Sequence, residues 1–340
     1  MKKQTIAFFE IKDSESSYIK KKLKSFNLLF FDDIINNVNI SKFKNVDMIS
    51  TFIYSRVSKD TMTKLPNLKV IASRSTGFDH IDLVAAKKKN ISVLNVPFYG
   101  ENTVAEHTFA LILSLSRHVH KSYVRTLKDD FSIDGLTGFD LKGKTMGLIG
   151  GGRIGMHVAK IARGFGMKVL VFDLRHDTFL QEVIGFEYVE MDYLLKNSDV
   201  ISLHVPYNKH TNHLINKESL SKMKKSAVLI NTARGGLIDT DALYHALSKK
   251  QLAGAGLDVI EGEEYLKEEH ALLHNSSNPD KWRSIVRDNK IFKLDNVVFT
   301  PHNAFNSKEA LLRILDTSLD NLLSCQDGTC QNLVNWFYFF

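Results

Sequence analysis

Residues 144–173 read KTMGLIGGGRIGMHVAKIARGFGMKVLVFD, and this stretch decides the fold of the chain. An apolar strand at residues 146–149 runs into Gly150, Gly152 and Gly155, and a helix is expected to follow. In such an arrangement the first glycine makes a tight turn, the second lets the backbone approach a pyrophosphate, and the third lets the helix pack close to the strand. The stretch therefore predicts the βαβ unit of a dinucleotide-binding domain.

The end of this unit predicts which dinucleotide is bound. A second apolar strand at residues 168–172 ends in Asp173, whose carboxylate suits the ribose hydroxyls and repels a 2′-phosphate, so NAD is favoured over NADP. The backbone amides near Arg153 and Ile154, at the helix N-terminus, are expected to face the phosphates. Arg175 lies two residues past the acid and leaves open that the site tolerates the 2′-phosphate of NADP. The more ordinary interpretation of Arg175 is a solvated loop residue.

Length and composition indicate an ordinary globular protein. The 340 residues are enough for about two domains, and the 44% hydrophobic and 24% charged residues are usual values. The net charge is +7, but the lysines are spread along the chain, so nucleic-acid binding is not expected. No apolar run approaches the roughly 20 residues of a membrane span, and the run at residues 6–9 is too short for a signal peptide, so a cytoplasmic location is expected.

The sequence predicts no metal site. Cys325 and Cys330 lie beside a glycine-containing turn with no partners at zinc spacing, so both thiols are expected to be reduced and structurally incidental. A long, largely buried helix is expected over residues 101–121 and carries His107, His118 and His120. These histidines are interpreted as packing or surface residues because no metal-ligand cluster accompanies them.

The rest of the chain alternates strand-like and helix-like segments. This alternation predicts a parallel α/β domain before the glycine-rich unit, with strands at residues 5–9, 28–31, 48–53, 69–73 and 91–94. No glycine turn follows the first of these strands, so this domain has no evident phosphate cradle and is expected to have a different task. Later strands are expected at residues 200–204, 227–231, 254–259 and 297–300, and the charged segment 265–290 is expected to be an irregular surface insertion.

Arg234, Glu263 and His302 follow three of the later strands. Ligands bind outside the carboxyl ends of strands in an open parallel sheet, so chain order places all three residues near one crevice. An arginine grips a carboxylate bidentately, a histidine shuttles a proton near neutral pH, and a hydrogen-bonded carboxylate stabilises an imidazolium. The set fits hydride transfer to a 2-keto acid. Each residue alone has a structural interpretation: a turn arginine, a loop histidine, and one member of an acidic patch with Glu261 and Glu264.

Seven segments then carry a resemblance to a known family: RSTGFDHIDL at 74–83, YGENTVAEHTFALIL at 99–113, GLIGGGRIG at 147–155, HVPYN at 204–208, LINTARGGLIDTDAL at 229–243, GLDVIEGEE at 256–264 and TPHNAF at 300–305. On these segments the chain resembles the D-isomer-specific 2-hydroxyacid dehydrogenases, and among them most closely the D-lactate dehydrogenases. The resemblance covers nearly the whole length, and the NTARGGLID and GLDVxExE patterns together are highly specific.

The resemblance implies a role for each residue of the catalytic set. Arg234 would bind the substrate carboxylate and carbonyl, His302 would be the acid/base, and Glu263 would be the acidic partner of the histidine. Formate dehydrogenases of this fold have glutamine at the acidic position, so Glu263 argues against formate. The backbone amides around Gly77 and Phe78 would hold the substrate carboxylate.

The resemblance also implies the remaining contacts. Tyr54, Tyr99 and Phe305 match positions that wall a small pocket around the substrate side chain in D-lactate dehydrogenases. Cofactor contacts, besides the three glycines, carry over to Arg153, Ile154, Asp173, Val205, Pro206, Thr211, Thr232, Ala233, Arg234 and Asp258.

The chain departs from the family pattern at three places. Phe98 stands where a small residue is common, and Asn303 and Asn306 stand where apolar or aromatic residues are more usual, so both departures bear on the choice of substrate. The ending NWFYFF, residues 335–340, replaces a polar ending and is expected to be a docking strand or a packed tail.

The expected protein is therefore an α/β enzyme with two Rossmann-like or flavodoxin-like domains and parallel sheets. Residues 1–100 with 301–340 would form the substrate-binding, catalytic domain, residues 101–300 the NAD-binding Rossmann domain, and the active site would lie in the cleft between them. Its expected activity is NAD-dependent reduction of pyruvate to D-lactate by a homodimer built on the NAD domains. The alternatives are a reductase of another 2-keto acid, branched-chain or glyoxylate, and a non-enzymatic NAD(H)-sensing protein that resembles the family's corepressors.

Overall fold

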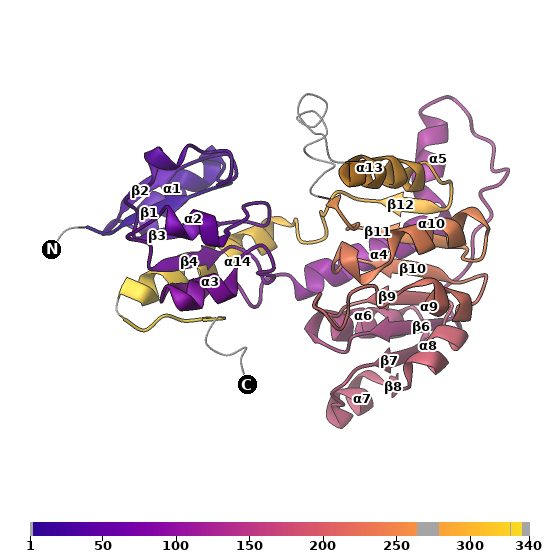
Figure 1. Cartoon of the computed structure of the whole chain (residues 1–340). Helices are drawn as coiled ribbons and strands as arrows, with labels where there is room; N and C mark the ends of the chain where they lie inside the picture. The colour runs from indigo at the N-terminus through magenta and orange to yellow at the C-terminus, as the bar shows by residue number, and fades with distance from the viewer. Residues whose placement is uncertain (1–2, 264–278, 327, 335–340) are drawn as a thin grey trace. The chain divides into compact units, whose positions relative to one another are not determined.

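A computed structural model describes residues 3–263, 279–326 and 328–334, and the chain divides into two compact units (Figure 1). The first unit comprises Met1–Tyr99 and Ser307–Phe340, and the second comprises Gly100–Asn306. Residues 301–306, which the sequence interpretation grouped with the first domain, therefore fall in the second unit.

The first unit is built on a five-stranded parallel sheet with the order β2-β1-β3-β4-β5. Its strands are β1 (Thr5–Phe8), β2 (Asn27–Phe30), β3 (Met48–Thr51), β4 (Val70–Ser73) and β5 (Ser92–Leu94). Its helices are α1 (Asp13–Lys22), η1 (Ile40–Lys42), α2 (Lys59–Thr63), α3 (Leu83–Lys88) and α14 (Lys308–Gln326). The five strands lie within one or two residues of the expected segments.

Both faces of this sheet are buried. Alternate strand residues such as Ile6 and Phe8 pack against α1 and α14, whereas Ala7 and Phe9 belong to the cluster on the side of α2 and α3. This is why the strands are continuously apolar rather than alternating with polar residues. Helix α14, from the end of the chain, supplies Leu315, Leu319 and Leu322 to the first of these clusters and so completes the fold of the first unit.

The side chains of Glu10 and Arg74 bind backbone groups at the carboxyl end of this sheet. In the second unit, the corresponding end of the sheet carries the glycine loop. Glu10, which has a left-handed φ of 55°, accepts hydrogen bonds from the backbone nitrogens of Phe52 (3.0 Å) and Tyr54 (3.1 Å). The buried guanidinium of Arg74 donates to the carbonyl oxygens of Phe9 (2.6 Å) and Glu10 (3.0 Å), and burial lowers its pKa.

The second unit is built on a seven-stranded parallel sheet with the order β12-β11-β10-β9-β6-β7-β8. Its strands are β6 (Thr145–Ile149), β7 (Lys168–Phe172), β8 (Glu187–Tyr188), β9 (Val200–Leu203), β10 (Val228–Asn231), β11 (Gly254–Leu257) and β12 (Val297–Phe299). Its helices are α4 (Glu101–Arg117), α5 (Val119–Thr126), α6 (Arg153–Gly164), α7 (Thr178–Ile184), α8 (Met191–Asn197), α9 (Lys217–Lys222), η2 (Gly235–Leu237), α10 (Thr240–Ser248) and α13 (Pro279–Phe292). Strand order reverses beside β6, and ligands of such sheets bind at this switch point.

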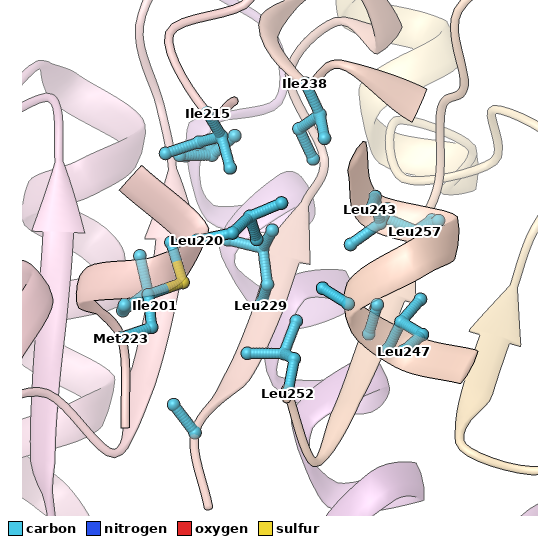
Figure 2. Packing of buried hydrophobic residues seen from close by; sticks show 14 of the residues in the cluster. Ile201, Ile215, Leu220, Met223, Leu229, Ile238, Leu243, Leu247, Leu252 and Leu257 are labelled. Carbon is cyan, nitrogen blue, oxygen red and sulfur yellow. The ribbon is translucent and has the colours of Figure 1, made fainter. Parts of the chain in front are cut away.

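Two apolar layers sandwich the second sheet. Figure 2 shows one of them, where Ile201 of β9, Leu229 of β10 and Leu257 of β11 meet side chains of α9 and α10 such as Leu220 and Leu243. The other face packs against α4, α6 and α7. Each layer buries about 20 apolar side chains, which stabilises the strand ends that carry the candidate site.

The long helix expected over residues 101–121 is interrupted, so that part of the prediction is wrong. Helix α4 ends at Arg117, His118 adopts a left-handed φ of 52°, and α5 begins at Val119. The carbonyl oxygen of Ser116 accepts a hydrogen bond from the backbone nitrogen of Phe139 (2.9 Å). A distant segment thus satisfies a carbonyl of the last turn, which helical spacing alone does not reveal.

The predicted insertion at residues 265–290 is wrong for its described part. Residues 264–278 lie outside the described residues, but Pro279–Phe292 forms helix α13, which packs beside α10 and β12. Its apolar Ile291 is fully buried in the core of the second unit. The ending at residues 335–340 also lies outside the described residues.

The expectation of two reduced cysteines is wrong in this structure, because Cys325 and Cys330 form a disulfide. Their Cα atoms lie 4.2 Å apart, and Gly328 between them has a φ of 79°, so a tight turn brings the thiols together. After the turn, Leu333 bridges to Leu94 of β5. Among the described residues, no helix is both long and apolar enough to cross a membrane.

Candidate active site

The glycine loop lies between β6 and α6, at the switch point of the second sheet. A Cβ on Gly155 would lie 2.2 Å from the carbonyl oxygen of Gly150, so only glycine lets α6 approach the loop this closely. A Cβ on Gly152, which precedes the first residue of α6, would meet nothing within 4 Å. The loop therefore borders open space at the end of a helix where a pyrophosphate fits.

Asp173 follows β7 and is joined to the glycine loop. Its Oδ2 accepts a hydrogen bond from the backbone nitrogen of Gly151 (2.6 Å), and its Oδ1 accepts one from that of Arg175 (2.8 Å). Each carboxylate oxygen has a second lone pair, so both can also accept from ribose hydroxyls. The same bonds orient the acid and pin the loop, an arrangement that the spacing in the sequence does not show.

A groove of about 480 Å³ borders the glycine loop along α6. It is lined by Gly151, Gly152 and Arg153, by further residues of α6 and by residues of α7. Arg153 has a side chain that is 67% exposed, and its Nη1 lies 3.8 Å from Glu101 Oε1. The guanidinium is thus accessible to a phosphate at the start of α6.

The loop after β9 holds three of the residues expected to contact the cofactor. Thr211 Oγ1 donates to the carbonyl oxygen of Pro206 (2.7 Å) and accepts from the backbone nitrogen of Asn208 (2.8 Å), which closes the loop after Val205. His204 begins this loop, and its Nε2 lies 2.9 Å from Ser202 Oγ. Burial lowers the pKa of His204 to about 3, so this imidazole is neutral and is not a candidate proton donor at neutral pH.

The loop after β10 carries Thr232, Ala233 and Arg234. Asn231 closes it, since its side chain donates to the carbonyl oxygen of Arg234 (2.8 Å) and accepts from the backbone nitrogen of Ala233 (3.0 Å). A Cβ on Gly235 would lie 2.1 to 2.4 Å from backbone atoms of Ile260 and Glu261, so the loop packs directly against the loop after β11. The two loops that carry Arg234 and Glu263 are therefore neighbours.

Glu263 and His302 form the acidic and basic pair of the site. Glu263 Oε1 lies 2.7 Å from Nδ1 of His302, and the two side chains are 25% and 17% exposed. The ring of Phe305 lies edge-on to that of His302, with centroids 6.3 Å apart. Glu261, two residues before Glu263, bonds instead to His213 Nε2 (2.7 Å), so the structure assigns the two glutamates to different histidines.

Asp258 organises the loop that carries His302. Its Oδ1 accepts hydrogen bonds from Thr300 Oγ1 (2.5 Å) and the backbone nitrogen of Asn303 (2.8 Å), and its Oδ2 accepts from that of Ala304 (2.9 Å). Burial alone would raise the pKa of Asp258, but the hydrogen bonds that the carboxylate accepts hold it below its ordinary value. The carboxylate is thus charged at neutral pH and fixes His302, whose φ of 53° is left-handed.

Two residues that the sequence interpretation did not assign to the site contact two of its loops. His107, interpreted as a packing or surface residue, places its Nε2 2.9 Å from Thr300 Oγ1 and 3.3 Å from Asp258 Oδ1. On the next residue of α4, Thr108 Oγ1 lies 3.0 Å from Thr232 Oγ1. The only signal in the sequence is that both belong to the segment YGENTVAEHTFALIL.

Four of the residues expected to bind substrate belong to the first unit. Gly77 accepts a hydrogen bond from Ser75 Oγ at its carbonyl oxygen (2.6 Å), and Phe78 packs partly against the core on the side of α2 and α3. The carbonyl oxygen of Tyr99 accepts from Arg313 Nε (2.6 Å), and the backbone of Tyr54 is held by Glu10. The two tyrosines and the loop around Gly77 are thus anchored within their own unit.

The residues around the glycine loop fit a dinucleotide. The glycine loop, Asp173 and the exposed Arg153 provide a cradle with room, a ribose acceptor and a cation, which are the parts that NAD requires. Within the described residues, no group of three or more His, Cys, Asp or Glu side chains is arranged to hold a metal ion.

Comparison with known proteins agrees with this geometry. Residues 109–304 match the family model described as D-isomer specific 2-hydroxyacid dehydrogenase, NAD binding domain. The chain is similar to the D-lactate dehydrogenase of Escherichia coli (strain K12), with 36% identity over 335 residues that cover 96% of this chain and 98% of that protein. It is also similar to the glyoxylate reductase of Thermococcus litoralis, with 39% identity over 306 residues that cover 88% of this chain and 86% of that protein.

Solved structures show the same similarity. The crystal structure of D-lactate dehydrogenase from Aquifex aeolicus complexed with NAD and lactic acid superposes with a TM-score of 0.89 and 38% identity. The superposition covers 97% of this chain and 99% of that one.

Proposed function

The chain belongs to the D-isomer-specific 2-hydroxyacid dehydrogenases, and we propose that within this family it reduces pyruvate to D-lactate. It is an NAD-dependent oxidoreductase that acts on CH–OH groups. The observation that carries the proposal is the 2.7 Å contact between Glu263 Oε1 and His302 Nδ1, at the carboxyl end of the NAD-binding sheet. A histidine held in this way is a proton donor and acceptor of the kind that carbonyl reduction needs.

The proton is expected to come from His302. Glu263 engages Nδ1, which leaves Nε2 as the nitrogen that donates to the carbonyl oxygen as negative charge develops there. When bound, NADH supplies the hydride for the carbonyl carbon. Oxidation of the hydroxy acid would use the same groups in reverse, with the neutral imidazole accepting the proton.

Arg234 is expected to hold the substrate. A guanidinium binds a carboxylate through two parallel hydrogen bonds and keeps its charge at every relevant pH. The loop that carries Arg234 packs against that of Glu263 through Gly235, which supports a common task for the two residues. The backbone amides around Gly77 and Phe78 are the expected second contact for the carboxylate.

The substrate is the finer part of the proposal. Pyruvate is favoured by the match of Tyr54, Tyr99 and Phe305 to the small, aromatic-walled pocket of D-lactate dehydrogenases. Glyoxylate is the second candidate, because a glyoxylate reductase is as similar to this chain as a D-lactate dehydrogenase is. Phe98, Asn303 and Asn306 are the departures that would shift the choice.

The test is the loss of NADH absorbance on mixing the purified protein with pyruvate, glyoxylate, 2-ketoisocaproate and oxaloacetate in parallel. The proposal expects the highest kcat/KM for pyruvate and a product that a stereospecific assay identifies as D-lactate. A higher kcat/KM for one of the other acids would keep the mechanism and replace the substrate. NADH binding without turnover of any acid would favour the sensing role.

We also propose that the protein is a homodimer, joined through its second unit. The support is α5 and the loop after it, where the side chains of Tyr123, Leu127, Phe131 and Ile133 are 63% to 81% exposed. The loop is held in shape, because Arg125 Nη1 donates to the carbonyl oxygens at residues 132 and 134. Large apolar side chains on a shaped projection indicate a contact surface.

Light scattering with gel filtration tests the dimer. Phe131→Asp is expected to convert the dimer to a monomer, whereas Phe179→Asp, a matched change at a residue that is 72% exposed on α7, is expected to leave it intact. A monomeric unmodified chain would refute the proposal. The cytoplasmic location expected from the sequence remains a prediction, which cell fractionation would test.

A further inference from the structure

Two adjacent residues of α4 touch the two loops on which the proposed reaction depends. His107 contacts Thr300 at the start of the loop of His302, and Thr108 contacts Thr232 in the loop of Arg234. A packed helix of 17 residues is a rigid reference, so one turn of α4 relates both loops to each other. Thr108 is fully buried, and His107 has a side chain that is 17% exposed.

We propose that His107 is a positioning residue, which holds the loop of the acid–base histidine through Thr300 and Asp258. The inference rests on the proposed function, since it concerns the same reaction, but it assigns a task to a residue outside the set of Arg234, Glu263 and His302.

The donors and acceptors in this cluster determine which ring nitrogen of His107 carries a proton. Asp258 is a carboxylate and only accepts, so the single hydroxyl proton of Thr300 goes to its Oδ1 at 2.5 Å. Thr300 Oγ1 must then accept from His107, which requires a proton on Nε2 of the ring. That N–H also points within 3.3 Å of Asp258 Oδ1 and is present in both the neutral and the protonated imidazole.

Asp258 connects the contact of His107 to the backbone around His302. Asp258 binds the backbone nitrogens of Asn303 and Ala304, and its carbonyl oxygen accepts from the backbone nitrogen of His302 (2.8 Å). These three consecutive N–H groups hold His302 at its left-handed φ of 53°, a conformation that residues other than glycine keep only where their surroundings impose it. Loss of His107 would let Thr300 and Asp258 rotate, and the direction of the imidazole would become less defined.

Two substitutions separate this role from simple packing. His107→Leu retains an apolar side chain of comparable size but no donor, whereas His107→Gln retains an N–H that can reach Thr300 Oγ1. The expected result is a fall in kcat of about 10- to 100-fold for leucine, since small errors of geometry cost this much, and recovery to within about fivefold of the unmodified enzyme for glutamine. The Kd for NADH, from the quenching of its fluorescence, is expected to change by a smaller factor than kcat, because the glycine loop and Asp173 are untouched even where Asp258 moves.

A double substitution tests the proposed route. Thr300→Val removes the hydroxyl through which His107 acts, so His107→Leu with Thr300→Val is expected to lose no more kcat than the worse single variant. His245→Ala, which removes an exposed histidine of α10 in the same unit, is the control and is expected to keep full kcat. Additive losses in the double variant would overturn the proposal, as would a leucine variant with unmodified kcat or a glutamine variant as slow as the leucine one.

Amide hydrogen exchange gives a readout that needs no turnover. The peptide that covers residues 300–306 is expected to exchange about tenfold faster in His107→Leu than in the unmodified chain, and at the unmodified rate in His107→Gln. Equal exchange in the leucine variant and the unmodified chain would overturn the positioning role. If the unmodified chain reduced none of the keto acids, the proposed function would fail while this measurement still decided the role of His107.

Discussion

Gly235 follows Arg234 and lies against the backbone of the loop that leads to Glu263. A methyl group at this position would sit 2.1 Å from the carbonyl carbon and 2.2 Å from the carbonyl oxygen of Ile260. Ordinary contacts between such atoms are about 3.5 Å or longer, so Gly235→Ala forces the two loops apart by roughly 1 Å. Neither obstacle is the flexible end of a side chain, and the displacement must therefore be taken up by backbone.

The expected effect is larger on the reaction than on the fold. Overpacking of this kind costs about 1 to 3 kcal/mol of stability, which lowers the thermal midpoint by several degrees but leaves the protein folded. A displacement of about 1 Å between the substrate-binding and proton-donating groups is worth roughly 100-fold in rate, so kcat for pyruvate is expected to fall by about that factor. The Kd for NADH is expected to rise by a smaller factor than kcat falls, because the glycine loop and Asp173 stay in place although Thr232 and Ala233 move with the displaced loop.

The measurements are steady-state kcat, calorimetric thermal midpoint and NADH fluorescence titration on Gly235→Ala beside Gly164→Ala. A Cβ on Gly164, in α6, meets nothing within 4 Å, so its alanine variant should keep full kcat and be as stable or slightly more stable. If Gly235→Ala kept unmodified kcat and thermal midpoint, the close approach of the two loops would be refuted. If it simply failed to fold, the conclusion that only the loops move would be wrong.

Three further predictions concern charge. Glu263→Gln keeps a hydrogen-bond acceptor beside His302 but removes the negative charge that stabilises a protonated donor, so kcat for reduction should fall about tenfold or more; an unchanged kcat would exclude this partner. Burial raises the pKa of Asp288 to about 6 from its ordinary 3.8, against the opposing effect of Arg287. The folded state thus holds this proton more tightly, and the stability so gained is complete below pH about 4 and lost as pH rises through about 6. The difference of roughly 2 pH units corresponds to roughly 3 kcal/mol, so Asp288→Asn should flatten the fall in thermal midpoint between about pH 4 and 6.5, and an unchanged slope would contradict the assignment. Asp173→Asn keeps an acceptor for the glycine loop but removes the repulsion of a 2′-phosphate, so the ratio of kcat/KM for NADPH to that for NADH should rise about tenfold or more, and an unchanged ratio would place the discrimination elsewhere.

Local pattern was enough to predict most of the fold. The sheets were largely predictable because most strands are short, continuous apolar runs, and the parallel connections between them allow few other arrangements. The edge strand β8, Glu187–Tyr188, has no such run and was not predicted. The break at His118 and the helix Pro279–Phe292 were not predicted. Helix α4 ends where the backbone nitrogen of Phe139 donates to the carbonyl oxygen of Ser116. In Pro279–Phe292, the buried Ile291 lies in a segment rich in charged residues, so no apolar stripe is evident in the sequence.

The proposed catalytic pair shows the same difference between what the sequence predicts and what the structure adds. Chain order places Glu261, Glu263 and His302 at one edge of a sheet, and the family resemblance selects Glu263 as the partner of the histidine. Only the structure shows the pairing itself, with Glu263 on His302 and Glu261 on His213.

The sequence by itself determined the βαβ unit, the position of the acid proposed to select NAD and the strand ends that carry Arg234, Glu263 and His302. These features depend on residue type and spacing along one strand, one turn and one helix, which are short-range properties. The tertiary structure decided which distant side chains meet: His107 with Thr300, Thr108 with Thr232, and Cys325 with Cys330. Such contacts join distant segments through packing and hydrogen-bond geometry. The sequence does not specify which polar groups will hydrogen-bond to each other until the helices and strands are packed.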